Sequence, residues 1–448
     1  MLGAIGGASA GFLVTQNFVI SAVILAAASV FIVAQLVSDW WRRLFVFTII
    51  AMGAGSSHIG WAVQIGGIAK LAGLVLLALV TMLTTRSVTA KWAGKTHKLA
   101  IAILWLTFAL ASLSIVWSHS RLETATQAVA FLAFVYILHR SSTTRWADRR
   151  TLIGDIGTAY WAAFALLLAG AVLALVGFPD AISEYSGRQQ GIFGNPNRLG
   201  LIAAVSVGLG VGWAIHKRNA VVWVSILIPL SQVILSQSRT SIIAVTVALL
   251  WVVFRSGLKN VIVVSYLSVT SLLVALAFSW RPLEGYFERF SATDGGDVLN
   301  SRTLAWRDVQ QSLLENPLGV GWAASQSTLE QWSLGGMASG LNSVHNSYLQ
   351  MIFELGLIGI IPVALILGLL VRVSTMKQIG LGIGLSFVAF TGLIVQITES
   401  AIFGLGQPYP YLFWLAVIAA TVYQPEPSRD RDSGTDVAVK RRRIVART

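Results

Sequence analysis

Long apolar runs recur from one end of this chain to the other, and they constrain its fold more than any other feature. Most cover about 18 to 26 residues, enough for a helix to cross a hydrocarbon core of about 30 Å. A glycine-interrupted apolar stretch at 2–14 leaves the total at about 12–14 spans. We therefore expect an all-α polytopic membrane protein. The runs fall near residues 18–37, 44–63, 66–84, 99–117, 123–138, 152–177, 199–215, 220–236, 240–254, 260–279, 348–371, 379–397 and 403–423.

The composition supports a membrane location. Only 11% of the residues are charged, against about a quarter in soluble domains. The net charge of +13 suggests nucleic acid in a soluble protein, but in a membrane protein it first indicates basic cytoplasmic loops. The chain has no cysteine, so no disulfide or thiolate metal site is expected. The first segment lacks a basic start and a small-residue cleavage site, so we expect it to be retained.

The basic residues gather in alternate connections between the runs, which sets the expected orientation. By the positive-inside rule these connections face the cytoplasm, and the chain lies in the cytoplasmic (inner) membrane. The other connections are 178–198, 236–239, 281–345 and 398–405, and we expect them on the extracytoplasmic side. We predict a transmembrane domain at 1–423, whose long extracytoplasmic loop is 281–345, and a disordered basic cytoplasmic tail at 424–448. The basic connections contain Arg42, Arg43, 86–98, 140–150, Lys217, Arg218, Arg255, Lys259, Arg372, Lys377 and 440–443.

Two polar clusters precede predicted spans on the extracytoplasmic side. The first, at 187–200, is rich in glycine and contains Arg188, Asn195 and Asn197. Its backbone amides suit an anion, but it is equally a loop that starts a helix. The second is Ser236-Gln237-Ser238-Arg239-Thr240-Ser241. Arg239 either extends to the interface or binds a phosphate, and its position on the side where positive charge is disfavoured supports the phosphate.

Two further clusters belong to the long loop. Residues 299–314 are predicted to form an amphipathic helix in which Arg302 stands one turn before Trp306, so both can face one groove. Alone, Arg302 suits a solvated surface position better. Where the chain re-enters the membrane, His345 is followed by Asn346 and Tyr348. A neutral imidazole there can accept a proton from an acceptor hydroxyl, whereas the simpler alternative is an interfacial histidine bonded to a carbonyl.

Two carboxylates and one missing motif bear on the chemistry. Glu354 lies inside the predicted span at 348–371 and Glu399 at the edge of another. A buried carboxylate needs a partner, and for Glu354 we expect a basic residue of the extracytoplasmic site, or else an ion pathway. No extracytoplasmic loop carries the Asp-x-Asp grouping that holds diphosphate through a cation, since Asp430-Arg431-Asp432 is in the tail. We expect arginines to hold any diphosphate, without a metal or other cofactor.

Taken together, these clusters resemble the O-antigen ligase and O-antigen polymerase family of bacterial membrane glycosyltransferases. Each match is short, but their order around one long loop is specific, and the resemblance covers most of the chain. The matching pieces are 193–197, 236–240, Arg302 with Trp306, Asn316-Pro317-Leu318-Gly319-Val320-Gly321, and His345-Asn346-Ser347-Tyr348-Leu349-Gln350 with Glu354 and Gly356.

The resemblance implies an inverting, metal-independent glycosyltransferase with a fold related to other lipid-linked-sugar enzymes, the GT-C type. Its donor would be a glycan on a polyprenyl diphosphate such as undecaprenyl diphosphate, and its acceptor a hydroxyl of a glycan, lipid or protein. Arg239 and Arg302 would hold the diphosphate, His345 would activate the acceptor, and Arg188 would extend the basic site. The remaining candidates for substrate binding are Asn195, Asn197, Trp306, Asn346, Tyr348 and Glu354.

Other functions are open on the sequence alone. Ligation, polymerisation and transfer to protein cannot be separated, because the acceptor is chosen by the shape of the loops. A polysaccharide or lipid transporter or flippase also suits many spans and an intramembrane Glu354. However, a carrier places its coupling residues near the midplane, whereas these polar clusters lie on one face. A receptor or scaffold leaves the outer arginines without a role.

Overall fold

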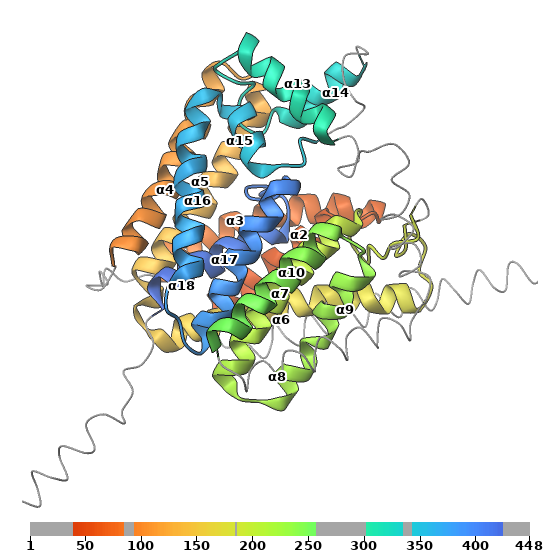
Figure 1. Ribbon diagram of the computed structural model, residues 1–448, viewed down its shortest axis with the longest axis vertical. Coiled ribbons are helices and arrows are strands. Elements are labelled where there is room, and N and C mark those ends of the chain that lie inside the picture. Colours follow the sequence, from red (N-terminus) through yellow and green to blue (C-terminus); the bar gives the residue numbers. More distant parts are fainter. Residues whose placement is uncertain (1–38, 85–93, 184–185, 257–301, 335–342, 424–448) are drawn as a thin grey trace, which may run out of the picture.

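The computed structural model describes residues 39–84, 94–183, 186–256, 302–334 and 343–423, and these ranges fold almost entirely into helices (Figure 1). Among them the only strand-like pairings are two isolated β-bridges, Ser57 with Phe193 and Ile182 with Gln189. The first helices are α2 (Trp40–Gly55), α3 (Gly60–Thr84), α4 (Lys95–Leu113), α5 (Arg121–Thr143) and α6 (Arg149–Leu175), with short 3-10 turns η1 (Ser114–Val116) and η2 (Arg145–Ala147).

The remaining helices follow in two groups. In chain order they are α7 (Pro196–Lys217), α8 (Ala220–Ser225), α9 (Leu227–Leu235), α10 (Arg239–Ser256), α13 (Arg302–Glu315), α14 (Ser325–Leu334), α15 (Ser347–Leu355), η3 (Leu357–Gly359), α16 (Ile360–Thr375), α17 (Leu381–Thr398) and α18 (Pro408–Val422). The helices α7 to α10 lie beside α6, and after the upper layer of α13, α14 and α15 the helix α16 runs along the side of the bundle next to α4 and α5 (Figure 1).

Seven of the described helices are long and apolar enough to cross a membrane. Three shorter apolar segments, Ala220–Leu235, Arg239–Phe254 and Pro408–Val422, accompany them. The all-α polytopic membrane architecture expected from the apolar runs is therefore confirmed. The expected runs at 18–37 and 260–279 and the expected tail at 424–448 lie outside the described residues.

The centre of the bundle is formed by α7, α17 and α18. In the apolar window of α7, 89% of residues are buried, against 28% in α3. Glycines bring α7 and α17 together, because a Cβ on Gly212 would lie 2.7 Å from the carbonyl oxygen of Leu381. This close approach packs the two backbones as small residues do between membrane helices. The exposed Leu and Ile side chains of α3 form an apolar outer surface suited to lipid.

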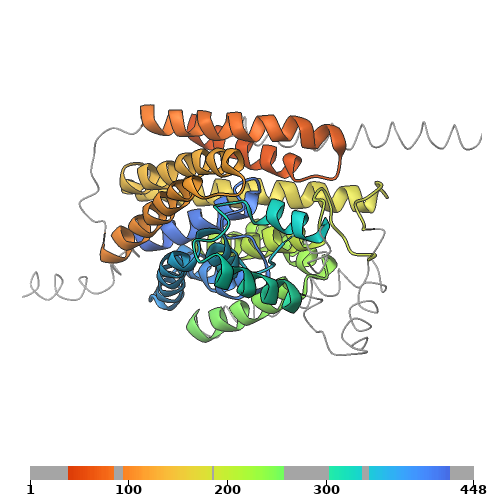
Figure 2. The ribbon, with the colours of Figure 1, turned by 90° about the horizontal axis from the view of Figure 1, so that it is seen from above.

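An upper layer of short helices lies over one end of the bundle. Figures 1 and 2 show α13, α14 and α15 at this end and over the middle of the molecule. The predicted amphipathic helix at 299–314 corresponds to α13, and its apolar face packs into a small separate core. That core contains Val309, Val320, Ala324, Leu329, Val344 and Phe353, with Trp306 and Leu313 packed against it.

The segment at 348–371 is not one continuous span, so this part of the sequence prediction was wrong. Gly356 has a φ of 73°, which ends α15 before α16 begins. The amides of Val320 and Gly321 donate to the carbonyls of Phe353 and Glu354 at 3.0 and 2.9 Å, and so satisfy the end of α15. Because an added Cβ on Gly356 would lie 2.2 Å from the carbonyl of Pro317, the break needs glycine.

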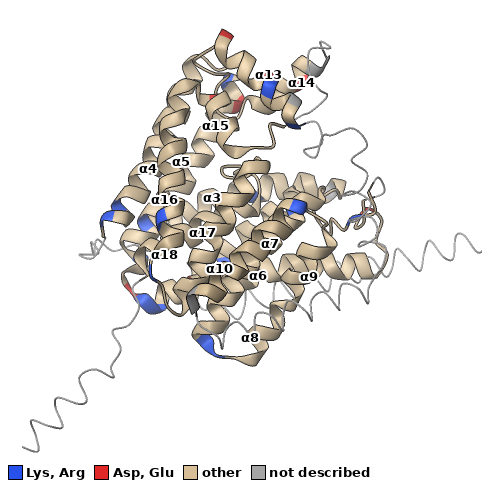
Figure 3. Cartoon of the chain, viewed as in Figure 1, with Lys and Arg blue, Asp and Glu red and all other residues tan. Residues whose placement is uncertain are grey.

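Basic residues gather at the end of the bundle opposite the upper layer. Figure 3 shows Lys and Arg at the α8 turn and near the start of α4. Close to this end, the fully buried Asp155 accepts hydrogen bonds from Arg42 Nε at 2.7 Å, Arg145 Nε at 2.7 Å and Trp146 Nε1 at 2.9 Å. Because an unpaired buried carboxylate would be costly, this network fixes the start of α2 against η2 and α6.

Candidate functional site

The turn between α17 and α18 carries Glu399, around which the polar clusters meet. Its side chain is 9% exposed. One carboxylate oxygen, Oε1, accepts from Asn197 Nδ2 at 3.0 Å and from Arg302 Nη2 at 3.2 Å. The other, Oε2, lies 3.9 Å from His345 Nδ1. One carboxylate thus joins the start of α7, the start of α13 and the loop before α15.

Arg188 and Asn197 bring the glycine-rich cluster into this site. Arg188 Nη2 donates to Asn197 Oδ1 at 2.6 Å, and Arg188 Nε donates to the carbonyl of Ser236 at 2.8 Å. The side-chain amide of Asn197 therefore links the Arg188 guanidinium to Glu399. Asn195 instead caps α7, since its Oδ1 accepts from the amide of Asn197 at 2.7 Å. The loop thus starts a helix, as the second of the two readings predicted, and its role as an anion site stays a prediction.

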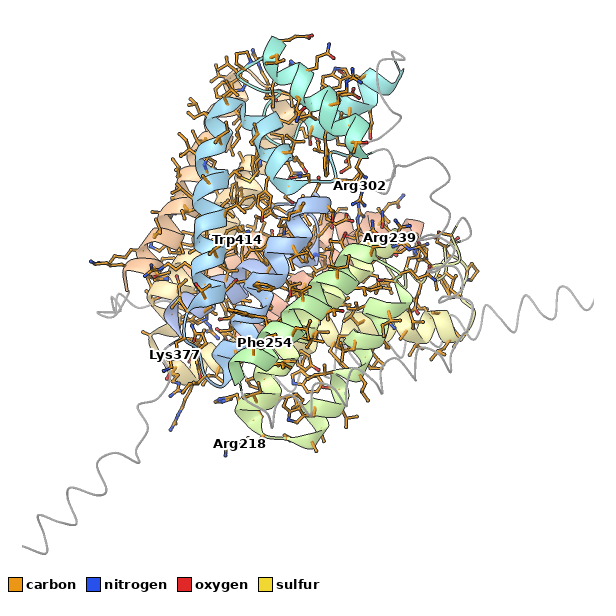
Figure 4. The ribbon with its side chains drawn as sticks, viewed as in Figure 1. Arg218, Arg239, Phe254, Arg302, Lys377 and Trp414 are labelled. Atoms are coloured by element: carbon orange, nitrogen blue, oxygen red, sulfur yellow. The ribbon has the colours of Figure 1, made fainter. Side chains whose placement is uncertain are left out.

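Arg239 and Arg302 approach the site from two different elements. Arg302 begins α13, and its Nη1 donates to the carbonyl of Thr398 at 2.6 Å. Thr398 Oγ1 lies 2.5 Å from Thr240 Oγ1, directly after Arg239 at the start of α10. Figure 4 shows Arg239 and Arg302 in the same region, far from Arg218 and Lys377 at the basic end of the bundle. Thr398 thus contacts Arg302 directly and contacts Thr240, the chain neighbour of Arg239.

His345 is held in an uncommon backbone conformation at the entrance to α15. Its φ is 51°, in the left-handed region that residues other than glycine seldom adopt. Gln237, two residues before Arg239, has a φ of 48°. Such conformations persist where the surroundings enforce them, and they concentrate at functional sites. The His345 side chain is 24% exposed, so one face of the imidazole remains accessible to a ligand.

Three of the remaining candidates form hydrogen bonds to backbone groups near the site. Trp306 Nε1 donates to the carbonyl of Val344 at 2.8 Å and so anchors the residue before His345. Asn346 caps α15, because its Oδ1 accepts from the amide of Leu349 at 2.9 Å. The hydroxyl of Tyr348 donates to the carbonyl of Leu393 at 3.5 Å, and burial raises its pKa. The hydrogen bonds of Trp306 and Asn346 thus fix the backbone on either side of His345.

The described hydrogen bonds of Glu354 are with uncharged groups. The prediction that a basic residue of the site would pair with this carboxylate was therefore wrong. Its Oε1 accepts from Ser325 Oγ at 2.6 Å and from Gln350 Nε2 at 2.7 Å. The carboxylate is 3% exposed, and burial raises its pKa above the ordinary value although these hydrogen bonds act in the opposite direction. Glu399 is the carboxylate that pairs with a basic residue of the site, Arg302.

A cavity of about 320 Å³ lies next to the Glu399 cluster. Its wall includes Ser347, Ser400 and Glu354. Ser347 lines the cavity and also contacts the Glu399 cluster, because its backbone amide donates to the carbonyl of Glu399 at 3.1 Å. The amide of Asn346 likewise donates to Ser400 Oγ at 3.2 Å. The turn that carries Glu399 is thus bonded to the segment that lines the cavity.

Glu399 is the main site residue that the sequence prediction left out. In the sequence, Glu399 stands out only as an acidic residue at the end of an apolar span. Glu354 stands out in the same way, because it also interrupts an apolar segment. Only the fold distinguishes them, because it places the N-terminal ends of α7 and α13 at Glu399 and polar uncharged groups at Glu354.

The arrangement suits a substrate that carries an anion and presents a hydroxyl for deprotonation. Arg302 pairs with Glu399 directly, Arg188 is linked to it through Asn197, and Arg239 lies in the same region (Figure 4). Guanidinium groups hold phosphate oxygens through paired donors. The accessible imidazole of His345 stands beside them, within 3.9 Å of the same carboxylate.

Comparison with known proteins gives one family for part of this region. A sequence model described as O-antigen ligase matches residues 224–364, which include Arg239, Arg302, His345 and Glu354. The match supports the family resemblance seen in the sequence motifs. No curated relative matches the chain.

Proposed function

We propose that this chain, which carries an O-antigen ligase domain at residues 224–364, is a membrane glycosyltransferase that takes its glycan from a polyprenyl diphosphate. The domain and the apolar helices support the broader assignment to a membrane ligase or polymerase of cell-surface polysaccharide. The donor, the acceptor hydroxyl and the absence of a metal are the further parts of the proposal.

The observation that carries the proposal is the junction at Glu399. It connects Arg302, Asn197 and, through Asn197, Arg188, and it places His345 beside them. A diphosphate ester carries negative charge that grows as it leaves, and guanidiniums fixed in advance stabilise that charge in the transition state. Because three arginines are available, the diphosphate can be held without a cation.

The reaction proposed is a direct displacement. The acceptor oxygen forms a bond to the anomeric carbon while the bond from that carbon to the diphosphate oxygen breaks, which inverts the configuration. Glu399 favours a hydrogen on Nδ1 of His345, which leaves Nε2 as the base that takes the acceptor proton. The electron pair of the broken bond remains on polyprenyl diphosphate, held by the arginines.

The proposed site faces the extracytoplasmic side of the cytoplasmic membrane. The basic end of the bundle supports this orientation, because positive loops remain in the cytoplasm and the site lies toward the other end (Figures 3 and 4). Nucleotide sugars are normally absent outside, so the energy for transfer arrives with the membrane-borne diphosphate.

Proteoliposomes provide the test that separates transfer from transport. Purified protein is supplied with a polyprenyl-diphosphate-linked glycan and with delipidated surface polysaccharide as acceptor. We expect longer or newly linked glycan together with free polyprenyl diphosphate. Movement of intact lipid-linked glycan across the bilayer, without release of the diphosphate, would instead establish a flippase.

A further inference from the structure

The cavity beside the Glu399 cluster is built largely from residues to which the catalytic proposal gives no role. Its wall combines the end of α2, the middle of α3, α5, the start of α7, α14, α15 and the turn that begins at Ser400. Its volume of about 320 Å³ is at the lower end of the range for small-ligand sites. It therefore has room for the end of a chain of sugars.

The charged groups of this cavity balance one another. Glu123 and Glu354 contribute two carboxylates, and Lys70 and Arg198 contribute two cations. The arginine-rich side of Glu399, by contrast, has an excess of positive charge. A diphosphate would gain less from this balanced wall than from the arginine-rich side, whereas an uncharged ligand does not need a net charge in its site.

The neutral polar groups of the cavity suit hydroxyls. Four amide side chains line it, from Gln127, Gln326, Gln350 and Gln407. An amide both donates and accepts, a carboxylate accepts and a cation donates, so the wall satisfies hydroxyls in either role. Two of the groups are fixed by the protein, since Glu354 Oε1 accepts from Gln350 Nε2 and from Ser325 Oγ at 2.7 and 2.6 Å.

The cavity also adjoins the reacting groups. Ser347 lines it and lies two residues after His345, while Ser400 lines it and directly follows Glu399. The amide of Ala401 donates to Ser347 Oγ at 2.8 Å, which ties the two segments together at this point. The cavity wall thus includes residues two positions after His345 and one position after Glu399.

We propose that this cavity is the acceptor subsite and that it binds the end of an uncharged, hydroxyl-rich glycan. The inference rests on the proposed function, since it gives the two substrates separate sides of one turn. The donor diphosphate lies on the arginine side, and the sugar that attacks it lies on the cavity side.

Cysteine protection tests the occupant directly, because the native chain contains no cysteine. Gln127→Cys places one thiol in the cavity wall, and Thr126→Cys, at an exposed position on the same helix, is the matched control. The probe is the delipidated surface polysaccharide of the source cell, cut to one to three sugars. We expect it to slow labelling of Gln127→Cys by N-ethylmaleimide and to leave Thr126→Cys unchanged.

Inorganic pyrophosphate is the competing probe. Protection of Gln127→Cys by pyrophosphate but not by the sugars would overturn the proposal and make the cavity an anion site. Equal labelling with and without millimolar sugars would overturn it as well.

Steady-state kinetics provide the second readout. Glu123→Gln removes one carboxylate from the cavity wall but keeps the size of the side chain. We expect the KM for the acceptor to rise about 10-fold, the scale of one charged hydrogen bond, with the KM for the donor unchanged. Glu315→Gln, exposed at the end of α13 and outside the cavity wall, should leave both constants unchanged.

The two proposals fail in different ways. If the wild-type protein transfers glycan but Glu123→Gln keeps the acceptor KM and the sugars do not protect, the subsite is wrong and the glycosyltransferase assignment stands. If the wild-type protein releases no polyprenyl diphosphate with any donor, the assignment itself is wrong, whatever the labelling shows.

Discussion

Arg302 Nη2 donates to Glu399 Oε1 across 3.2 Å, joining the first residue of α13 to the turn after α17. The two residues are 97 positions apart in the sequence. The same carboxylate oxygen accepts from Asn197, so the orientation of Arg302 depends on two other elements. An arginine held in this way needs little rearrangement to meet a developing charge, which is the condition for electrostatic catalysis.

Replacement of Arg302 by alanine should reduce the turnover of transfer about 10²- to 10³-fold, the usual effect of removing one fixed donor to a developing anion. Initial rates of polyprenyl diphosphate release measure this. Arg307→Ala is the control, because Arg307 is exposed on the same helix. Near-normal rates in Arg302→Ala would remove this arginine from the mechanism.

Glu399→Gln should lower turnover about 10- to 150-fold, which corresponds to a charged hydrogen bond of about 1.5–3 kcal/mol. The amide keeps an oxygen for Asn197 and Arg302 but loses the charge that orients His345. Glu315→Gln, at the exposed end of α13, should retain wild-type rates. A Glu399→Gln variant with unchanged turnover would reduce this carboxylate to a packing role.

Trp306→Phe tests the support behind His345. The substitution deletes the indole donor to the carbonyl of Val344 and keeps most of the apolar contact of α13. We expect a loss of stability of about 0.5–1.5 kcal/mol, the net value of one hydrogen bond, and a fall in kcat without a matching rise in the donor KM. Thermal unfolding and steady-state kinetics provide both values, and Trp332→Phe on α14 serves as the control. Normal kcat combined with lowered stability would limit Trp306 to folding.

Glu354 predicts a pH dependence of stability. Because burial raises the pKa of this carboxyl in the folded protein, the unfolded chain loses the proton more readily. The stabilising contribution is then complete below the ordinary pKa of 4.5 and is lost as the pH rises through the raised folded value. Glu354→Gln keeps an oxygen for Ser325 and Gln350 but cannot ionise.

The unfolding temperature of the wild-type protein should therefore fall relative to that of Glu354→Gln as the pH increases from 4.5. Nanodisc samples followed by intrinsic fluorescence at several pH values measure this difference. Parallel curves for the two proteins would show that Glu354 does not titrate differently in the folded state.

The sequence was sufficient for the elements whose signal is local. Apolar length predicted the membrane helices, and the spacing of Ala305, Trp306, Val309 and Leu313 predicted α13. The cap at Asn195 and the helix that follows it were also readable, because Pro196 at the next position favours a helix start. These features depend on neighbours within a few residues.

Features set by contacts between distant segments were not predictable. The end of α15 at Gly356 depends on the close approach of Pro317, and this contact divides an apolar run that length alone makes continuous. The choice between Glu354 and Glu399 as partner of the arginines depends on where α7 and α13 begin in space. In the hydropathy pattern both carboxylates are acidic residues in or next to an apolar segment. In the folded protein they have different neighbours.

The most direct test of the central claim follows free polyprenyl diphosphate by mass spectrometry, with purified protein in nanodiscs, a polyprenyl-diphosphate-linked glycan, delipidated polysaccharide acceptor and EDTA. Wild-type protein should release the diphosphate as glycan is transferred, and His345→Ala should not, although it should remain folded with a similar unfolding temperature. Equal release by wild-type protein and His345→Ala, or release that requires a restored divalent cation, would contradict a site in which this histidine and the surrounding arginines carry out the transfer.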